Sequence, residues 1–198
     1  ECGTERPNEY ARAFFENEYR LDYLIHTYGK PFIVWGHGIV MGGGIGLMSG
    51  ASHRVVTEAA RLAMPEINIG LFPDVGGTWF LNHAPGRTGL FLGLTGANIN
   101  AADALFVGMA DRFIPNGRKQ AVLAALQAAE FGRCTASNNA VVSRVLRAQE
   151  ARDQLPASKV REHLDLINAV TDGDSCAEIC QRILAIETDD TWLQKGIA

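Results

Sequence analysis

The stretch 36-GHGIVMGGGIGL-47 contains three consecutive glycines, Gly42 to Gly44, shortly after the extended apolar run at 32–35. Glycine loses more conformational freedom on folding than any other residue, so it suits neither a strand interior nor a helix interior. Three in a row indicate that another group approaches the backbone closely, or that a backbone N–H points where a side chain would block it. We interpret 32–35 as a short buried strand and 45–52 as a brief helix, joined by this glycine turn.

Three familiar glycine-rich loops do not fit this stretch. A G-x-G-x-x-G phase that starts at Gly42 has Leu47 at its third glycine, and one that starts at Gly44 has Ser49 there. No Gly-Lys-Ser/Thr of a P-loop occurs, and 47-LMSGAS-52 does not match the G-x-S-x-G of serine hydrolases. What remains is a strand-to-helix turn whose bare amides favour a negative or developing-negative oxygen. Close packing of two backbones explains the glycines equally well.

Two carboxylates stand among large apolar residues in 64-MPEINIGLFPDVGG-77, namely Glu66 and Asp74. Carboxylates are rarely buried unless they are paired or functional. An apolar wall raises the pKa of a carboxyl group, which suits proton transfer near neutral pH. The alternative is structural, because Glu66 could cap a helix after Pro65 and Asp74 could cap a helix that begins at Gly76.

Two histidines, His37 and His53, lie on either side of the glycine turn. A lone histidine beside such a turn is more often packed or hydrogen-bonded than catalytic. We therefore interpret both as structural, with His37 the better candidate for a catalytic base.

The flanking sequence predicts a mixed α/β region. Apolar residues recur every three, four or seven positions over 9–28, which is typical of a helix, and 29-GKP-31 ends it. The other elements predicted up to residue 115 are two short strands around a turn at 58–60, short helices at 85–96 and 100–110, the second capped by Asn100, and a strand at 111–115.

From Arg118 onward the chain is rich in Ala, Leu, Arg and Glu at helical spacing and has no glycine clusters. We divide the chain into an α/β core at 1–115 and a helical region at 116–198.

Composition excludes several classes of protein. The 198 residues carry a formal net charge of −4, and Lys and Arg form no basic stripe, so no nucleic-acid partner is expected. No apolar run approaches the ~18 residues of a membrane span, so no membrane partner is expected. The four cysteines show no metal-ligand spacing beyond one pair a helical turn apart, so we expect reduced thiols and no metal site; they are Cys2, Cys134, Cys176 and Cys180.

Several of these motifs together resemble the crotonase (enoyl-CoA hydratase/isomerase) superfamily. They are 30-KPFIVWGHGIVMGGGIGL-47, 56-VTEAARLAMPEINIGLFPDVGGTWFL-81 and 94-LTGANINAADALFVGMADRFIP-115. The first two, together with 14-FFENEYRLD-22, most resemble the subgroup that hydrolyses 3-hydroxyisobutyryl-CoA. The resemblance implies a spiral of ββα units with a helical C-terminal extension. It also implies an N-terminal part of the fold that this chain does not contain, since the chain begins at Glu1 without the family's early strands.

The resemblance assigns roles to five residues. Gly43 would supply one backbone N–H of an oxyanion hole for the thioester carbonyl, with Gly42 beside it in the substrate-binding turn. Glu66 would cleave the thioester as general base or as nucleophile, and Asp74 would bind the 3-hydroxyl of the substrate or orient Glu66. Glu18 would lie in the substrate pocket.

One departure separates the branches of the superfamily. Hydratases have a first catalytic glutamate shortly after the glycine run, and this chain has Gly46 there. The expectation is therefore hydrolysis of a short 3-hydroxyacyl-CoA in valine breakdown. A hydratase or isomerase, and a non-catalytic acyl-CoA-binding module, are the alternatives. CoA enters as part of the substrate without a further cofactor; a homo-oligomer is left open, and the expected compartment is the cytoplasm, or the mitochondrial matrix in a eukaryote.

Overall fold

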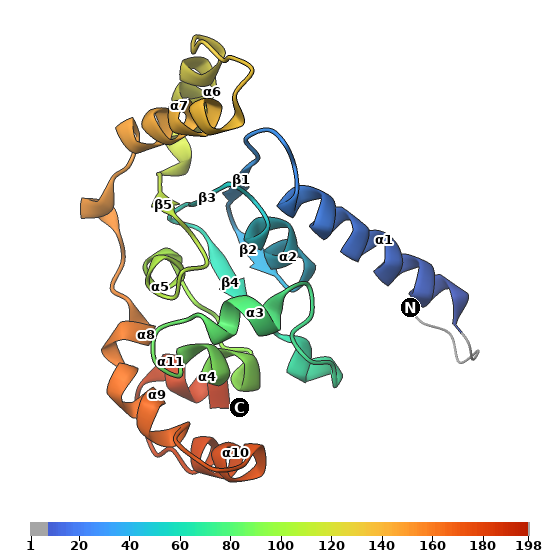
Figure 1. Cartoon of the computed structure of the whole chain (residues 1–198). Helices are drawn as coiled ribbons and strands as arrows, with labels where there is room; N and C mark the ends of the chain where they lie inside the picture. Colours follow the sequence, from blue (N-terminus) through green and yellow to red (C-terminus); the bar gives the residue numbers. More distant parts are fainter. Residues whose placement is uncertain (1–7, 198) are drawn as a thin grey trace.

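The computed structural model describes residues 8–197, and Figure 1 shows their arrangement. The strands are β1 (Ile33–Gly36), β2 (Ile39–Met41), β3 (His53–Val56), β4 (Arg61–Ala63) and β5 (Arg112–Phe113). The α-helices are α1 (Glu9–His26), α2 (Gly43–Ser49), α3 (Gly77–Asn82), α4 (Thr88–Thr95), α5 (Ala101–Phe106), α6 (Lys119–Gln127), α7 (Thr135–Ala148), α8 (Lys159–Glu162), α9 (Leu164–Val170), α10 (Cys176–Leu184) and α11 (Thr191–Ile197). Short 3₁₀ helices are η1 (Glu66–Ile69), η2 (Asn116–Arg118) and η3 (Arg152–Gln154).

Two small parallel sheets carry the strands. The first has the order β1-β3-β5, with Trp35 opposite Val55, and the second pairs β2 with β4, with Val40 opposite Leu62. In each pair of consecutive strands, β1–β2 and β3–β4, the first strand therefore joins one sheet and the second strand joins the other, and a helix follows. This repeated strand-strand-helix path confirms the predicted spiral of ββα units. The two strands predicted around the turn at 58–60 exist as β3 and β4, but they pair with other strands.

The glycine stretch differs from its prediction in two respects. It contains an additional strand, β2, and the helix predicted over 45–52 begins at Gly43 and ends at Ser49. The carbonyl oxygen of Gly42 accepts hydrogen bonds from the N–H groups of Ile45 and Gly46, which starts the helix two residues earlier than predicted. Gly42 itself has φ 52° and ψ −120°, a conformation that essentially requires glycine.

Helix capping follows the sequence closely at two helices. Asn8 caps α1 by accepting a hydrogen bond from the N–H of Ala11, and α1 ends at His26. Asn100 caps α5 as predicted, within a reciprocal capping box with Asp103. The predicted flanking strands shift slightly, to β1 at Ile33–Gly36 and β5 at Arg112–Phe113.

The main hydrophobic core spans most of the chain, from Val40 in β2 to Leu193 in α11. Helices α8 to α11 lie beyond α4 and α5, away from the sheets (Figure 1). A smaller cluster joins β3 and Ile114, the residue after β5, to α6 and α7. The division at residue 115 stays a prediction, and the core includes residues from both of its sides. Helix α1 projects from the body and buries only Ile25 (Figure 1).

Candidate active site

Two carboxylates that are 48 positions apart in the sequence approach the glycine turn, Glu18 and Glu66. A Cβ atom added to Gly42 would lie 2.9 Å from Oε1 of Glu66, and one added to Gly43 would overlap Oε1 of Glu18. Gly44, in contrast, faces Val40 at an ordinary contact distance of 3.8 Å. Polar oxygens therefore approach the backbone at Gly42 and Gly43, which favours the chemical explanation of these glycines over close backbone packing.

Gly43 is the first residue of α2. The N–H groups of a helix's first turn have no acceptor inside the helix, so the N–H of Gly43 is available to a ligand oxygen. It lies in the same turn that the Glu66 carboxylate approaches.

Glu66 opens η1 and is buried, with 6% of its surface exposed. It does not cap a helix through its side chain, because Pro65 occupies the N-cap position of η1 without a side-chain hydrogen bond. Its Oε2 atom is buried and has no partner within residues 8–197. A buried carboxylate oxygen without a donor is costly unless a ligand or water serves it.

Asp74 approaches the same region from the loop before α3. It does not cap that helix: Gly76 is the N-cap, and no side chain caps α3. Instead, Oδ2 of Asp74 accepts a hydrogen bond of 2.7 Å from the hydroxyl of Tyr19. Asp74 thus faces α1, the helix that also carries Glu18.

Sequence reasoning missed two residues of this group, Tyr19 and Asp22. Both carboxylate oxygens of Asp22 are buried and lack a partner among the described residues. Asp22 lies four positions after Glu18 on α1, and like charges at this spacing destabilise a helix. The pair of Glu18 and Asp22 on one face of a predicted helix was therefore the signal in the sequence that could have identified Asp22 as a site residue.

Burial and mutual repulsion raise the pKa values of these groups. Burial is the larger cause for Glu18, with the charge of Asp74 adding to it. Burial, then Glu18 and Asp74, raises the pKa of Asp22 to about 6. Burial also raises the pKa of Glu66, against a hydrogen bond from its own backbone N–H. The Tyr19 hydroxyl has its pKa raised to about 12 by burial and by its bond to Asp74.

The Asp22 pKa predicts a pH-dependent stability. The folded value of about 6 lies above the ordinary 3.8, so the stability that neutral Asp22 provides is fully present below pH 3.8 and is lost as the pH rises through 6. Above that pH the protein holds an unpartnered buried charge. The Asp22→Asn variant is therefore expected to have a higher free energy of unfolding than wild type at pH 7. Its free energy of unfolding is also expected to fall less between pH 4 and pH 7, as measured by urea unfolding. Equal pH slopes for the two proteins would contradict this.

Val75, next to Asp74, has a strained backbone. Its φ is +45°, which is a genuine outlier for a β-branched residue, and its side chain is buried against α2. A Cβ atom at Gly46 would lie 2.6 Å from the Cβ of Val75. Only glycine at position 46 allows Val75, and with it Asp74, to keep this position.

Gly46→Ala is accordingly expected to lower the free energy of unfolding by about 1–3 kcal/mol, through overpacking against Val75. The matched control is Gly44→Ala in the same helix, where the new methyl group meets only Val40 at contact distance. This control is expected to gain about 0.5–1 kcal/mol, since alanine is the better helix former. Thermal or urea unfolding measures both, and a neutral Gly46→Ala would show that Val75 does not depend on Gly46.

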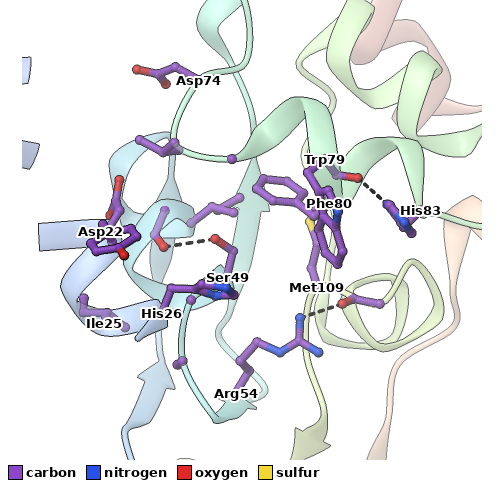
Figure 2. A pocket seen from close by; sticks show the side chains of 18 of the residues that line it. Asp22, Ile25, His26, Ser49, Arg54, Asp74, Trp79, Phe80, His83 and Met109 are labelled. Carbon is purple, nitrogen blue, oxygen red and sulfur yellow. Dashed lines mark hydrogen bonds between the residues drawn. The ribbon is translucent and has the colours of Figure 1, made fainter. Parts of the chain in front are cut away.

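A cavity of about 1120 Å³ lies beside the carboxylates, between α1, α2 and the loop that precedes α3. Figure 2 shows Asp22 and Asp74 along one side and Trp79 and His83 along the other. Both aspartates and Tyr19 line it, whereas Glu18, Glu66 and the Gly42–Gly43 turn do not. The cavity therefore meets the catalytic candidates at Asp74 and extends away from them past Asp22.

The other candidates have structural partners. His37 is exposed and its Nδ1 lies 2.8 Å from the hydroxyl of Thr57. His53 is buried, its ring contacts the Ser52 and Ser143 hydroxyls, and burial lowers its pKa. Neither histidine lines the cavity or contacts Glu66 through a hydrogen bond within residues 8–197.

One cluster has the residue types of a metal site, formed by Glu162, His163 and Asp190, with ligand atoms within 4.8 Å of one another. The ammonium of Lys159 lies 2.9 Å from both carboxylates, so a cation of the protein already pairs with each of them. Cys134, Cys176 and Cys180 are free thiols, and Cys2 lies outside the described residues. No helix in the described part of the chain has the length and apolarity to cross a membrane.

Comparisons with known proteins find similar proteins over most of the chain. The Enoyl-CoA hydratase/isomerase family model matches residues 2–198. A chicken protein (Gallus gallus) named 3-hydroxyisobutyryl-CoA hydrolase, mitochondrial, is 38% identical over 172 residues, which are 87% of this chain and 44% of that protein. The structure of a carnitinyl-CoA dehydratase from Mycobacterium thermoresistibile superposes with a TM-score of 0.79 at 35% identity, covering 97% of this chain and 52% of that one.

A third relative has a name of a different kind. The small ribosomal subunit protein mS47 of Neurospora crassa is 44% identical over 101 residues, which are 51% of this chain and 20% of that protein. The chain spans about half the length of the hydrolases that it matches.

Proposed function

The chain belongs to the enoyl-CoA hydratase/isomerase family, and from this premise we propose that it carries the catalytic residues of a 3-hydroxyacyl-CoA hydrolase, with 3-hydroxyisobutyryl-CoA as substrate. The observation that carries the proposal is the buried Glu66 carboxylate, which approaches the bare backbone of the Gly42–Gly43 turn and has one oxygen without a partner. The hydrolase names of relatives at 36–38% identity support it.

In the proposed reaction the thioester carbonyl lies on the glycine turn. The N–H of Gly43 donates to the carbonyl oxygen, and this bond strengthens as the oxygen gains negative charge. Glu66 acts in one of two ways. As a general base it takes a proton from water while that water's oxygen bonds to the carbonyl carbon; as a nucleophile its own oxygen forms that bond. In both cases the C–S bond breaks, CoA leaves as the thiol after protonation, and water supplies the oxygen of the free acid.

Asp74 and Glu18 shape the acyl end of the proposed site. Asp74 holds the 3-hydroxyl of the substrate or orients Glu66, and Tyr19 fixes its carboxylate by donating to Oδ2. Glu18 lies against Gly43, where a Cβ atom would overlap its Oε1. CoA enters as part of the substrate, and the proposal needs no other cofactor. The mitochondrial name of a relative supports the mitochondrial matrix as the compartment in a eukaryote.

Gly46 disfavours the alternative, a hydratase. Addition of water across a double bond in this family uses two glutamates, and the first position holds Gly46 here. A glutamate at 46 would meet Val75 at the first side-chain atom, so this backbone does not accept the second acid. Glu66 is left as the single glutamate of that pair.

A second candidate is a non-catalytic module that binds acyl-CoA or assembles with other chains. The match to a ribosomal subunit protein favours this second candidate, because that relative is 44% identical over 101 residues of the chain. The two candidates differ in turnover.

Release of free CoA tests the proposal. The full-length protein is incubated with 3-hydroxyisobutyryl-CoA, isobutyryl-CoA and acetyl-CoA, and the thiol is followed with a chromogenic reagent. Fast release from the first ester and slow release from the other two is expected. Tight binding of 3-hydroxyisobutyryl-CoA without any thiol release would contradict hydrolysis and support the binding module.

A further inference from the structure

We propose that Asp22 is a specificity-determining residue of the acyl pocket, whose carboxylate accepts a hydrogen bond from a hydroxyl group on the acyl chain. The site would thereby select hydroxylated acyl-CoA esters over unsubstituted ones. The inference rests on the proposed function for the identity of the ligand, and it adds a residue to which neither the motifs nor the relatives assign a role.

The first observation is the state of the Asp22 carboxylate. Both of its oxygens are buried, and neither has a hydrogen-bond partner within residues 8–197. No hydrogen-bond donor of the described residues reaches it: the hydroxyl of Tyr19 donates to Asp74, and that of Ser49 donates to the carbonyl of Gly46. A buried acceptor without a donor costs free energy, and a turn of the Asp22 side chain towards the cavity that it lines would let a ligand hydroxyl remove that cost.

The second observation is the location of Asp22. It lines the same cavity as Asp74, on the side where α1 packs against α2, and Figure 2 shows the two aspartates on one side of that cavity. Glu18 and Asp74 are close enough to shift its pKa electrostatically, and these are the residues proposed to hold the acyl end. An acyl group that passes Asp74 into the cavity meets Asp22 next.

The third observation is the charge around Asp22. Glu18 and Tyr19 face it from α1, Asp74 faces it from the loop before α3, and α2 contributes no charged side chain. His26 lies one turn later on α1 and also lines the cavity, but no cation among the described residues lowers the pKa of Asp22, so retention of this carboxylate costs stability at neutral pH. A residue that lowers stability and lines a cavity is better explained by binding than by folding.

An unpaired buried acceptor selects among ligands because it weakens the binding of those that cannot donate a hydrogen bond to it. An unsubstituted acyl chain leaves Asp22 desolvated and unpaired, whereas a hydroxylated chain satisfies it. A hydroxyl donates one hydrogen bond, and Asp74 already accepts one from Tyr19, so we assign the substrate hydroxyl to Asp22 and leave Asp74 to orient Glu66.

The test measures binding rather than turnover. Two non-hydrolysable analogues are used, in which a methylene group between the sulfur and the carbonyl of 3-hydroxyisobutyryl-CoA or of isobutyryl-CoA replaces the thioester with a thioether. Calorimetry measures the affinity of each analogue for the full-length protein. The variants are Asp22→Leu, Asp22→Asn and the control Asp165→Leu, which replaces an exposed aspartate on α9. The measured quantity is the ratio of the two affinities.

Asp22→Leu is expected to lower the preference for the hydroxylated analogue about 10-fold or more, the usual size for a hydrogen bond to a charged group. Asp165→Leu keeps the wild-type ratio. An unchanged ratio in Asp22→Leu would overturn the proposal.

If Asp22→Leu does not fold, Asp22→Asn decides. The wild-type ratio is expected to rise with pH through about 6, because an ionised carboxylate is the stronger acceptor, and the Asn variant is expected to lack that rise. Parallel pH profiles would overturn the proposal, since Glu18, Tyr19 and Asp74 are present in both proteins. Free CoA release from the true thioester is measured on the same samples. A protein that shows the preference but releases no CoA contradicts the proposed hydrolysis and leaves the role of Asp22 intact.

Discussion

Replacement of Glu66 by Gln is expected to lower kcat for CoA release by about 10²–10⁴-fold, the range for removal of an acid–base group. The amide keeps the size of the side chain but can neither take a proton from water nor form an acyl-enzyme anhydride. Because the change removes a buried charge without a partner at Oε2, the folded state is not expected to lose stability. Thiol release and urea unfolding on the same preparation separate the two effects.

The wild-type pH profile gives a second readout for Glu66. Its ionised form is the active one, and burial raises its pKa, so kcat/KM is expected to rise with pH through that raised value. Residual activity of Glu66→Gln is expected to lack this step. Glu130→Gln, at an exposed position whose side chain makes no hydrogen bond or ion pair in the described structure, is the matched control. Near wild-type kcat in Glu66→Gln would remove Glu66 from the mechanism.

The largest effect on stability is expected from Gly89→Ala. Gly89 lies in α4 where this helix crosses α3, and a Cβ atom there would overlap the backbone carbonyl of Leu81. A backbone atom cannot rotate away as a side chain can, so the two helices must separate. The expected loss is at least about 3 kcal/mol, beyond ordinary overpacking, and the variant is expected to be recovered largely unfolded.

Gly93→Ala is the control for that prediction. It lies one turn later in α4, and its Cβ would lie 3.3 Å from Cδ1 of Leu81, at the far end of a side chain that can change rotamer. A change of less than about 1 kcal/mol is expected from it. Circular dichroism and urea unfolding compare the two variants. Equal stabilities would show that the crossing of α3 and α4 is not set by Gly89.

Local signals in the sequence predicted local structure well. The apolar stripe over 9–28 and the turn at 29–31 gave α1, and Asn100 capped α5 as expected. The strand β2 was missed because three residues between two turn glycines are too few to show alternation. The separation of β3 and β4 into two sheets depends on which strands pair across the chain, and no local pattern carries that information.

The candidate site likewise contains residues that the sequence predicted and residues that it did not. Motif resemblance brought Glu18, Gly42, Gly43, Glu66 and Asp74 together, and the structure places Glu18 and Glu66 against the glycine turn. The resemblance could not predict that Tyr19 donates a hydrogen bond to Asp74, 55 positions away, or that Asp22 is buried without a partner among the described residues. Both follow from how α1 packs against α2 and the loop before α3, which depends on contacts distant in sequence.

The most direct test of the central claim compares two reactions of the full-length protein in parallel. One is release of CoA from 3-hydroxyisobutyryl-CoA, and the other is hydration of crotonyl-CoA, followed by loss of its absorbance. With Glu66 intact and glycine at position 46, rapid CoA release without detectable hydration is predicted. Hydration of crotonyl-CoA without release of CoA would contradict the account, because hydration in this family uses a second glutamate at the position that Gly46 occupies here.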